Sequence, residues 1–415
     1  MTQIDLTTPG PAATGRPYRP LEGVRVLDLS RLIPGALATR KRADLGAEVV
    51  KIEEPGRGDY LRTIAPLVDG ESIMHRLLNR GKKSVTVDYR TPAGRATVER
   101  LAAVAEVVVE VSRPGRLAEM GLDLARLRER RPEVVVCSIT GFGQTGPLAD
   151  LPSHGMNIDA LAGCLTPDRN GRPRLAAGIY NSLGAELGGL NAALAVLAAL
   201  VRARATGEGA WIDVSCWDSA VEYGRYRLAH LDATGEEMND VRALGPLYDL
   251  YETADGGLVF LGAIERKFWE NLCRGLGRPD LLDRWRSDGD VAFTEDTELR
   301  RELEAVFQTA PAAEWADRFL RWEVPGSRVL TAADVLESPH LAARGLLRRD
   351  GSAIPQIADP VRWIETGERP GADAAPSPAL GADTADVLAR WLGAGAAVDA
   401  GTDGGTAAPA RRGRP

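Results

Sequence analysis

One histidine stands where acid–base chemistry has a natural place in a parallel sheet. An apolar run at 134–138 predicts a buried strand, and the glycine-rich turn 141–147 and then His154 follow it. Open parallel sheets bind ligands at the carboxyl ends of their strands, so this layout predicts a titratable imidazole beside a ligand crevice. The alternative is a surface or hydrogen-bonded histidine, which is what most histidines are.

A second ionisable group, Glu265, ends an apolar strand and opens a helix within the segment 262–269. A carboxylate at this place is favoured by the helix dipole alone, which is a purely structural explanation. The functional interpretation is a carboxylate that orients and charges an imidazole, raising its basicity. These residues by themselves leave both interpretations open.

Two basic turns each adjoin a predicted strand: 79–84, which holds Arg80, Lys82 and Lys83, and 113–116, which begins with Arg113. Solvated loops are the ordinary explanation for such runs. Two basic turns at one sheet edge also form a plausible phosphate cradle. Glu53 ends another predicted strand, at a place where an acid often meets a ribose.

Strands and helices alternate along the first half of the chain, which predicts an α/β domain with a parallel sheet and right-handed crossovers. The first strand–helix turn lacks the G-x-G-x-x-G spacing, so no dinucleotide fingerprint is present. The predicted strands are 24–29, 48–53, 84–88, 106–110, 134–138 and 211–215, and the predicted helices include 34–45 and 92–105.

The length of 415 residues predicts two domains, because one hydrophobic core usually stops growing below that size. A large domain is expected over 20–222. A smaller α+β domain is expected over 223–325, with a hairpin turning at 254–257. The termini, 1–19 and 393–415, are rich in Pro, Gly, Ala and Thr and are expected to be disordered.

Composition removes several classes of protein. A net charge of −7 argues against a nucleic-acid binder. The first residues have no signal-peptide pattern, and the longest apolar segment, 187–201, is too short and too mild to span a bilayer. Four dispersed cysteines lack metal-ligand spacing and fit a reducing cytoplasm. No nucleophile elbow, P-loop or zinc motif occurs, so no metal is expected.

Seven motifs in order resemble one family. From Pro20 to about Leu346 the chain is similar to the class III coenzyme A transferases, and within them to the α-methylacyl-CoA racemase branch. The motifs are LEGVRVLDLS, ADLGAEVVKIEEPGRGD, LNRGKKSVTVDYRTPAGR, RPGRLAEMGL, ITGFGQTGP, ATGEGAWIDV and YETADGGLVFLGAIERKFW.

This resemblance implies an interlocked homodimer of subunits that each have a Rossmann-like large domain and a small domain. The segment 326–392 would return to complete the large domain. The implied ligand is an acyl-CoA at the domain and subunit interface. Coenzyme A then enters as part of the substrate, with no prosthetic group.

The resemblance also assigns roles. His154 matches the racemase histidine and Glu265 the racemase glutamate, while the two basic turns match contacts to the CoA phosphates. Independently of the resemblance, backbone amides of the loop 141–146, which contains Gly141 and Gly143, or a helix terminus could stabilise an enolate. The substrate pocket is expected to be lined by Met156, Ile158, Tyr180 and Tyr248.

One departure from the family is decisive for the chemistry. An aspartate precedes the long apolar helix in both branches, as the transferases' nucleophile and the racemases' second base. Gly184 aligns with it here, and Gly155 replaces the acid that usually follows the histidine. Glu186 or Asn181 could substitute only if the backbone shifts.

Three hypotheses follow from this departure. The first is proton transfer at the α-carbon of a CoA thioester by the His154–Glu265 pair, as an isomerase- or lyase-like reaction with a single base (elimination, isomerisation, decarboxylation or slow epimerisation) rather than two-base racemisation. The second is a noncatalytic subunit that pairs with a complete homologue. The third is a CoA transferase with a displaced carboxylate nucleophile.

Overall fold

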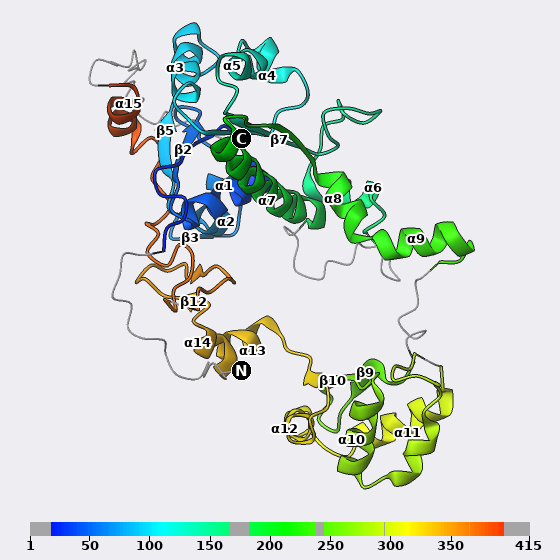
Figure 1. The fold of residues 1–415 in the computed structure, drawn as a ribbon. Coiled ribbons are helices and arrows are strands. Elements are labelled where there is room, and N and C mark those ends of the chain that lie inside the picture. Colours follow the sequence, from blue (N-terminus) through cyan, green and yellow to red (C-terminus); the bar gives the residue numbers. More distant parts are fainter. Residues whose placement is uncertain (1–17, 166–181, 238–244, 294, 365, 394–415) are drawn as a thin grey trace, which may run out of the picture. The chain divides into compact units, whose positions relative to one another are not determined.

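The computed structural model describes residues 18–165, 182–237, 245–293, 295–364 and 366–393. The chain forms two compact units (Figure 1). Unit 1 runs to Arg225 and resumes at Gly345, and unit 2 spans Tyr226–Arg344. The expected first boundary, at 222/223, lies close to this division. The return to unit 1 comes at 345, whereas the resemblance implied 326. Most of the termini expected to be disordered lies outside the described residues.

A six-stranded parallel sheet forms the centre of unit 1, in the order β5-β2-β1-β6-β7-β8. Its inner strands are near-continuous apolar runs, as expected for parallel strands covered on both faces. Leu27 on β1, for example, lies beside Val50 on one side and Val108 on the other. The predicted parallel α/β architecture is therefore confirmed. The strands are β1 (Arg25–Asp28), β2 (Glu48–Glu53), β5 (Lys83–Thr86), β6 (Val107–Glu110), β7 (Val135–Thr140) and β8 (Trp211–Ser215).

Helices pack on both faces of this sheet. Helices α1 (Leu32–Asp44) and α7 (Leu183–Thr206) cover one face, where Ala38, Ala192 and Val196 join a core with strand residues. Helices α3 (Pro92–Ala102), α5 (Leu124–Arg130) and α15 (Thr384–Leu392) cover the other. The last helix thus completes a layer that the first hundred residues begin.

Helix α7 is the longest element of the described chain. Ser182 caps its start by accepting from the amide of Ala185, and Gly207, in the left-handed conformation, ends it. By length and composition α7 could cross a membrane, but half of its most apolar stretch is buried in the protein. Core helices meet the same criterion, and α7 packs against α1.

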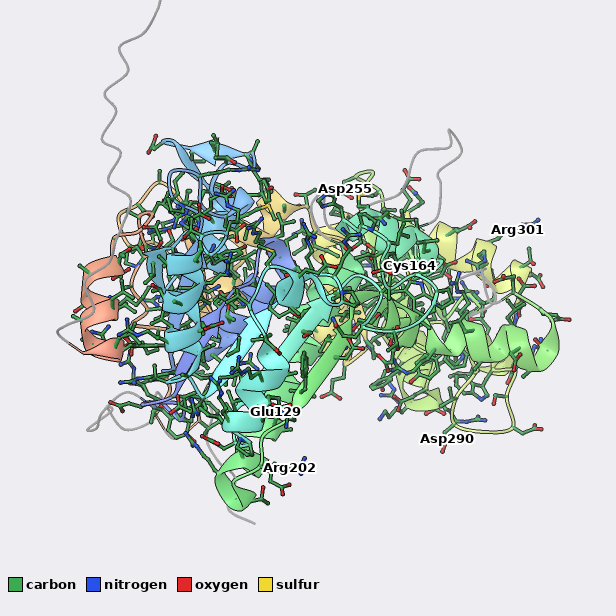
Figure 2. The ribbon with its side chains drawn as sticks, turned by 90° about the horizontal axis from the view of Figure 1, so that it is seen from above. Glu129, Cys164, Arg202, Asp255, Asp290 and Arg301 are labelled. Atoms are coloured by element: carbon green, nitrogen blue, oxygen red, sulfur yellow. The ribbon has the colours of Figure 1, made fainter. Side chains whose placement is uncertain are left out.

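The remaining elements of unit 1 are short and connect or flank the sheet. Figure 2 shows the side chains, with Glu129 of α5 and Arg202 of α7 pointing outward. The elements are η1 (Tyr60–Arg62), β3 (Leu67–Val68), β4 (Glu71–Ser72), α2 (Ile73–Leu78), α4 (Arg116–Glu119), α6 (Gly155–Leu161), α8 (Cys216–Tyr223), α9 (Arg225–Thr234, which runs on into unit 2), β12 (Leu347–Arg348) and β13 (Gln356–Ile357).

Unit 2 is an α+β structure with a three-stranded antiparallel sheet in the order β11-β10-β9. The predicted hairpin is present between its first two strands, and Trp269, Phe307 and Trp315 lie in a separate aromatic core. The elements are β9 (Tyr248–Glu252), β10 (Leu258–Gly262), α10 (Arg266–Leu276), η3 (Pro279–Arg284), α11 (Thr297–Phe307), α12 (Ala312–Trp322), β11 (Gly326–Arg328), α13 (Ala332–Glu337) and α14 (Pro339–Arg344).

Candidate active site

A cavity of about 520 Å³ opens in unit 1 at the carboxyl ends of β1 and β7. Its size suits a small-molecule ligand. The first turns of α1, α6, α7 and α8 all contribute to its wall, which is largely aliphatic. In a parallel sheet, the helices that follow the strands begin at the edge formed by the carboxyl ends of the strands. This explains why segments distant in sequence meet at the cavity.

The cavity wall holds one imidazole, that of His154, one guanidinium, that of Arg31, and, among the described lining residues, no carboxylate. Its ionisable side chains are those of Arg31, Tyr60, His154 and Cys216. Burial raises the pKa of the Cys216 thiol to about 12, and the nearby Asp159 adds to this effect. A thiol protonated at neutral pH is a poor nucleophile, so Cys216 is part of the wall.

His154 lines the cavity, on the loop that the sequence predicts for it. It is the N-cap residue of α6, and its backbone amide donates to Oδ1 of Asn157, which reaches back from the first turn. The amide of Asn157 donates in turn to the carbonyl oxygen of His154 at 3.0 Å, and the two bonds fix the path of the backbone on which the imidazole sits. Gly141, Met156 and Ile158 line the same cavity.

Other expected site residues are placed differently. The amide of Gly143 donates to Oγ1 of Thr140 at 2.8 Å, so this N–H already has an acceptor. Tyr248 is in unit 2 and packs edge-on against Phe260. Tyr180 lies outside the described residues.

Glu265 is also in unit 2, at the N-cap of α10, where its carboxylate pairs with Lys267 at 2.9 Å. Nearly half of the Glu265 side chain is exposed. His154 belongs to unit 1 and Glu265 to unit 2, and a contact between the two side chains remains a prediction.

The residue of α7 that faces the cavity is Ala185, not Gly184. A Cβ atom on Gly184 would lie 2.7 Å from the carbonyl oxygen of Cys216 and 3.0 Å from Cγ2 of Ile158. An aspartate therefore does not fit at Gly184, and a carboxylate that faced the cavity from this turn would have to come from position 185. The residue present there, alanine, has no functional group.

A buried carboxylate from α6 supports this turn. Asp159 accepts from the hydroxyl of Ser182 at 3.0 Å and from the amides of Leu183 and Gly184 at 3.0 and 2.8 Å. It thereby satisfies N–H groups that the first turn of α7 would otherwise leave unpaired. Asp159 is a structural cap behind the cavity wall.

Gly155 lets this junction close. A Cβ atom there would lie 2.4 Å from Cβ of Ser182, so no other residue type fits without movement. Gly155 and Gly184, which stand where the family is expected to have acidic residues, thus both lie in one closely packed contact between α6 and α7.

The first basic turn has its charges neutralised inside the protein. Arg80 is buried and pairs with Asp44 at 2.9 Å, and Lys82 is fully buried beside Asp28 at 3.1 Å. These two side chains hold the fold together and are not exposed to a phosphate, contrary to the expected role.

The other two expected phosphate contacts are more accessible. Lys83 is partly exposed and pairs with Asp383 of the returning segment, and Arg113 donates to the backbone oxygen of Asp150. Their contact with CoA phosphates stays a prediction.

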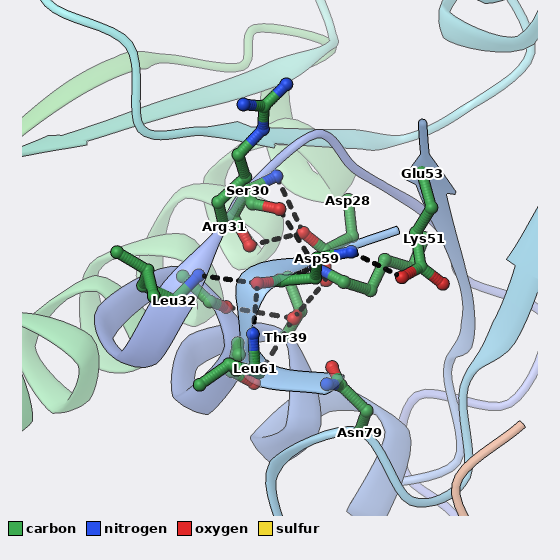
Figure 3. A network of polar contacts seen from close by, with 12 residues as sticks. Asp28, Ser30, Arg31, Leu32, Thr39, Lys51, Glu53, Asp59, Leu61 and Asn79 are labelled. Carbon is green, nitrogen blue, oxygen red and sulfur yellow. Dashed lines mark hydrogen bonds and ion pairs between the residues drawn. The ribbon is translucent and has the colours of Figure 1, made fainter. Parts of the chain in front are cut away.

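Behind the cavity lies a buried ionic network (Figure 3). Lys51 pairs with Asp59 at 2.8 Å and lies 4.0 Å from Asp28. Burial would lower the pKa of Lys51, but the two carboxylates outweigh it and raise the pKa. For Lys82 burial prevails over Asp28, and its pKa falls to about 8.

This network supports the cavity wall directly. Oδ1 of Asp59 accepts from the amides of Leu32 at 3.2 Å and Leu61 at 3.0 Å. Leu32 is the first residue of α1, has a φ of +61° and lines the cavity. The ion pairs thus hold a strained backbone position that shapes the site.

Glu53, expected at a ribose, is buried instead. Its carboxylate accepts from Arg62 at 2.6 and 2.8 Å and from the hydroxyl of Ser84 at 2.6 Å. Burial would raise the pKa of Glu53, but these bonds and the nearby Lys51 lower it to about 2.

This shift predicts a dependence of stability on acid. The folded-state pKa of Glu53 lies below its ordinary value of 4.5. Its ionised carboxylate therefore adds to the free energy of unfolding above about pH 4.5, and this stabilisation is lost as the pH falls toward 2. The contribution is on the order of 3 kcal/mol. Urea unfolding from pH 6 to pH 3 should show a shallower pH slope for Glu53→Gln than for the wild type. Equal slopes would contradict this assignment.

Three residues of the site were missed by sequence reasoning: Arg31, Asp159 and Ala185. Arg31 had a usable signal, because it lies three residues after the end of the first strand and so on the same edge as His154. Asp159 had none, since its role depends on the distance between α6 and α7. Among the described residues no cluster of histidine, cysteine and carboxylate side chains could hold a metal ion.

The sequence model of CoA-transferase family III matches residues 21–384, and the chain belongs to this family. It is 32% identical to human succinyl-CoA:glutarate CoA-transferase over 91% of this chain and 89% of that protein. It is 31% identical to acetyl-CoA:oxalate CoA-transferase of Acetobacter aceti, over 86% and 93%. The crystal structure of Rv3272 from Mycobacterium tuberculosis superimposes with a TM-score of 0.77 at 32% identity, covering 89% and 99%.

The two enzymes are named for CoA transfer between acids. Their names lend no support to the racemase-like reaction that the resemblance implied, and they favour the alternative of a CoA transferase.

Proposed function

We propose that this enzyme transfers coenzyme A from an acyl-CoA to a free carboxylic acid in the cavity of unit 1. The observation that carries the proposal is the composition of that cavity: an aliphatic wall with Arg31 and His154 and, among the described lining residues, no carboxylate. The family membership supplies the thioester substrate. The lack of a carboxylate among the described lining residues affects which group attacks the thioester.

The acceptor itself can provide the carboxylate that the wall lacks. Its oxygen attacks the thioester carbonyl, the carbon–sulfur bond breaks, and a mixed anhydride and the CoA thiolate form. The thiolate then attacks the acceptor's carbonyl carbon. The carbon–oxygen bond of the anhydride breaks, releasing the donor acid and the new thioester. No proton is consumed, and the oxyanion of each addition step needs stabilisation by positive charge.

The chain's residues have three tasks in this reaction. The aliphatic wall excludes water, which would hydrolyse an anhydride. His154 and the first turn of α1 place hydrogen-bonding groups and dipoles around the reacting oxygens, and Arg31 adds a positive charge elsewhere in the cavity wall. Holding both acids beside one thiolate converts an intermolecular reaction into an effectively intramolecular one. CoA acts as substrate, and the reaction needs no prosthetic group.

We further propose a homodimer, as the resemblance implies, and a location in the reducing cytoplasm, which the four free cysteines favour. Leu190, Leu194 and Val201 of α7 are 43%, 69% and 70% exposed. Their spacing places them on one face of the helix, where an apolar patch favours a protein partner. A heteromer with a complete homologue would bury the same face, and purification of the chain from its source distinguishes the two by the identity of the copurifying subunit.

The test of the proposed function is direct. Purified protein is mixed with a short-chain acyl-CoA and a panel of free acids, and the new acyl-CoA is detected by chromatography. We expect formation of the acceptor's thioester together with release of the donor acid. Hydrolysis alone, or no reaction with any acid, would refute the transfer.

A second candidate is proton transfer at the α-carbon of an acyl-CoA by His154, which the position of His154 in the cavity favours. In deuterated water this reaction would place deuterium at the α-carbon without any acceptor acid, and His154→Gln would abolish the uptake. We expect no uptake above the uncatalysed rate if the enzyme is only a transferase.

A further inference from the structure

Arg31 is the one guanidinium in the described wall of the cavity. It lies three residues after the end of β1, and Figure 3 shows its guanidinium pointing away from the network of Asp28, Lys51 and Asp59. It donates to the hydroxyl of Tyr89 at 2.6 Å. This bond orients the group without neutralising it.

No carboxylate among the described residues lies within ion-pair distance of Arg31. The neighbouring cations are all paired inside the protein: Lys51 with Asp59, Lys82 with Asp28 and Arg62 with Glu53. Arg31 is partly exposed, so water solvates part of its charge, and an anionic group of a ligand in the cavity would be its first ionic partner among the described residues.

From this unpaired guanidinium we infer that Arg31 binds the second, non-reacting carboxylate of a dicarboxylic substrate. This inference rests on the proposed function. A bidentate arginine pair withdraws electron density from a carboxylate, which would weaken a carboxylate that has to attack. Arg31 is thus better suited to the end of the acid that does not react. The aliphatic wall fits the methylene chain between the two ends.

The test uses acids matched in length. Succinate and butyrate differ only in a carboxylate that replaces a methyl group, and glutarate and valerate form a second pair. Wild-type enzyme should show a higher kcat/KM for the dicarboxylic member of each pair. Arg31→Met should lower that value by about 10- to 100-fold, the range for a lost hydrogen bond to a charged group. It should leave the monocarboxylic value nearly unchanged.

Two further variants sharpen the result. Arg90→Met is the matched control, because Arg90 is exposed and pairs with Asp88 and Glu54 outside the cavity. The Arg90→Met enzyme should prefer dicarboxylic over monocarboxylic acids by the same ratio of kcat/KM as the wild type. Tyr89→Phe keeps the charge of Arg31 but removes its orienting bond, and should weaken the preference without abolishing it.

CoA phosphates are the other source of an anion for Arg31. If Arg31→Met lowers kcat/KM equally for all four acids, or weakens binding of free CoA in calorimetry, the inference is overturned while CoA transfer stands. If wild-type enzyme transfers CoA to none of the acids, the proposed function fails. Calorimetric binding then decides the inference: tighter binding of succinate than butyrate, lost in Arg31→Met, supports it, and equal binding overturns it.

Discussion

Replacing Lys51 by methionine is expected to lower the free energy of unfolding by about 3–5 kcal/mol, the cost of breaking a buried ion pair from one side. Methionine fills a similar volume but leaves Asp59 without its cation and Asp28 with Lys82 alone. Burial of carboxylates without compensating charge is the reason for this large effect. The midpoint of urea unfolding, followed by circular dichroism, measures it.

Lys83→Met provides the matched control, since Lys83 lies on the same sheet and pairs with Asp383 at 2.9 Å. The Lys83 side chain is 44% exposed, so its loss should cost less than about 1 kcal/mol. Equal effects of the two substitutions would show that burial of the network does not govern its contribution.

Substituting Ala185 by aspartate should create a covalent intermediate that the wild-type enzyme does not form. Ala185 faces the cavity from the first turn of α7, where the helix dipole favours a carboxylate. With an acyl-CoA this carboxylate can form an anhydride and then an enzyme-bound CoA thioester. Hydroxylamine should convert it to a hydroxamate, detected by peptide mass spectrometry at the substituted position. Absence of this product in a folded variant would show that position 185 does not face the thioester.

Gly184→Asp is the companion experiment one residue earlier. The new Cβ would lie 2.7 Å from the carbonyl oxygen of Cys216, and the carboxylate would be packed beside Asp159. We expect a loss of about 3 kcal/mol or more of stability from steric overlap and buried like charge. No hydroxamate should form there. A stable Gly184→Asp enzyme with a modified aspartate would mean that the cavity wall is assigned wrongly.

The difference between Gly184 and Ala185 shows what a comparison of sequences alone does not decide. Adjacent residues of an α-helix point about 100° apart, so a shift of one residue in the alignment changes whether the aligned side chain faces the cavity or the core. The extended strands and the loop with His154 were predicted correctly because buried parallel strands leave strong apolar runs and their ends converge on one edge.

The basic turn with Arg80 and Lys82 illustrates a different limit. In the sequence, a charged residue in a short polar run looks like an exposed surface residue. Only the position of the carboxylate that pairs with it shows that the residue is buried. The partners Asp44 and Asp28 lie on other elements, more than thirty residues away along the chain. Sequence spacing gives no information on such pairs, so a phosphate cradle and a buried ionic network produce the same pattern.

Direct attack by the acceptor acid can be tested in a single turnover with an acceptor whose carboxylate oxygens are ¹⁸O. With enzyme in excess over acyl-CoA, the account predicts ¹⁸O in the released donor acid, because the acceptor's oxygen becomes the bridging atom of the mixed anhydride. An enzyme carboxylate acting as nucleophile would instead release the first donor acid with unlabelled oxygen and retain ¹⁸O in the protein. Unlabelled donor acid would therefore contradict the proposed mechanism.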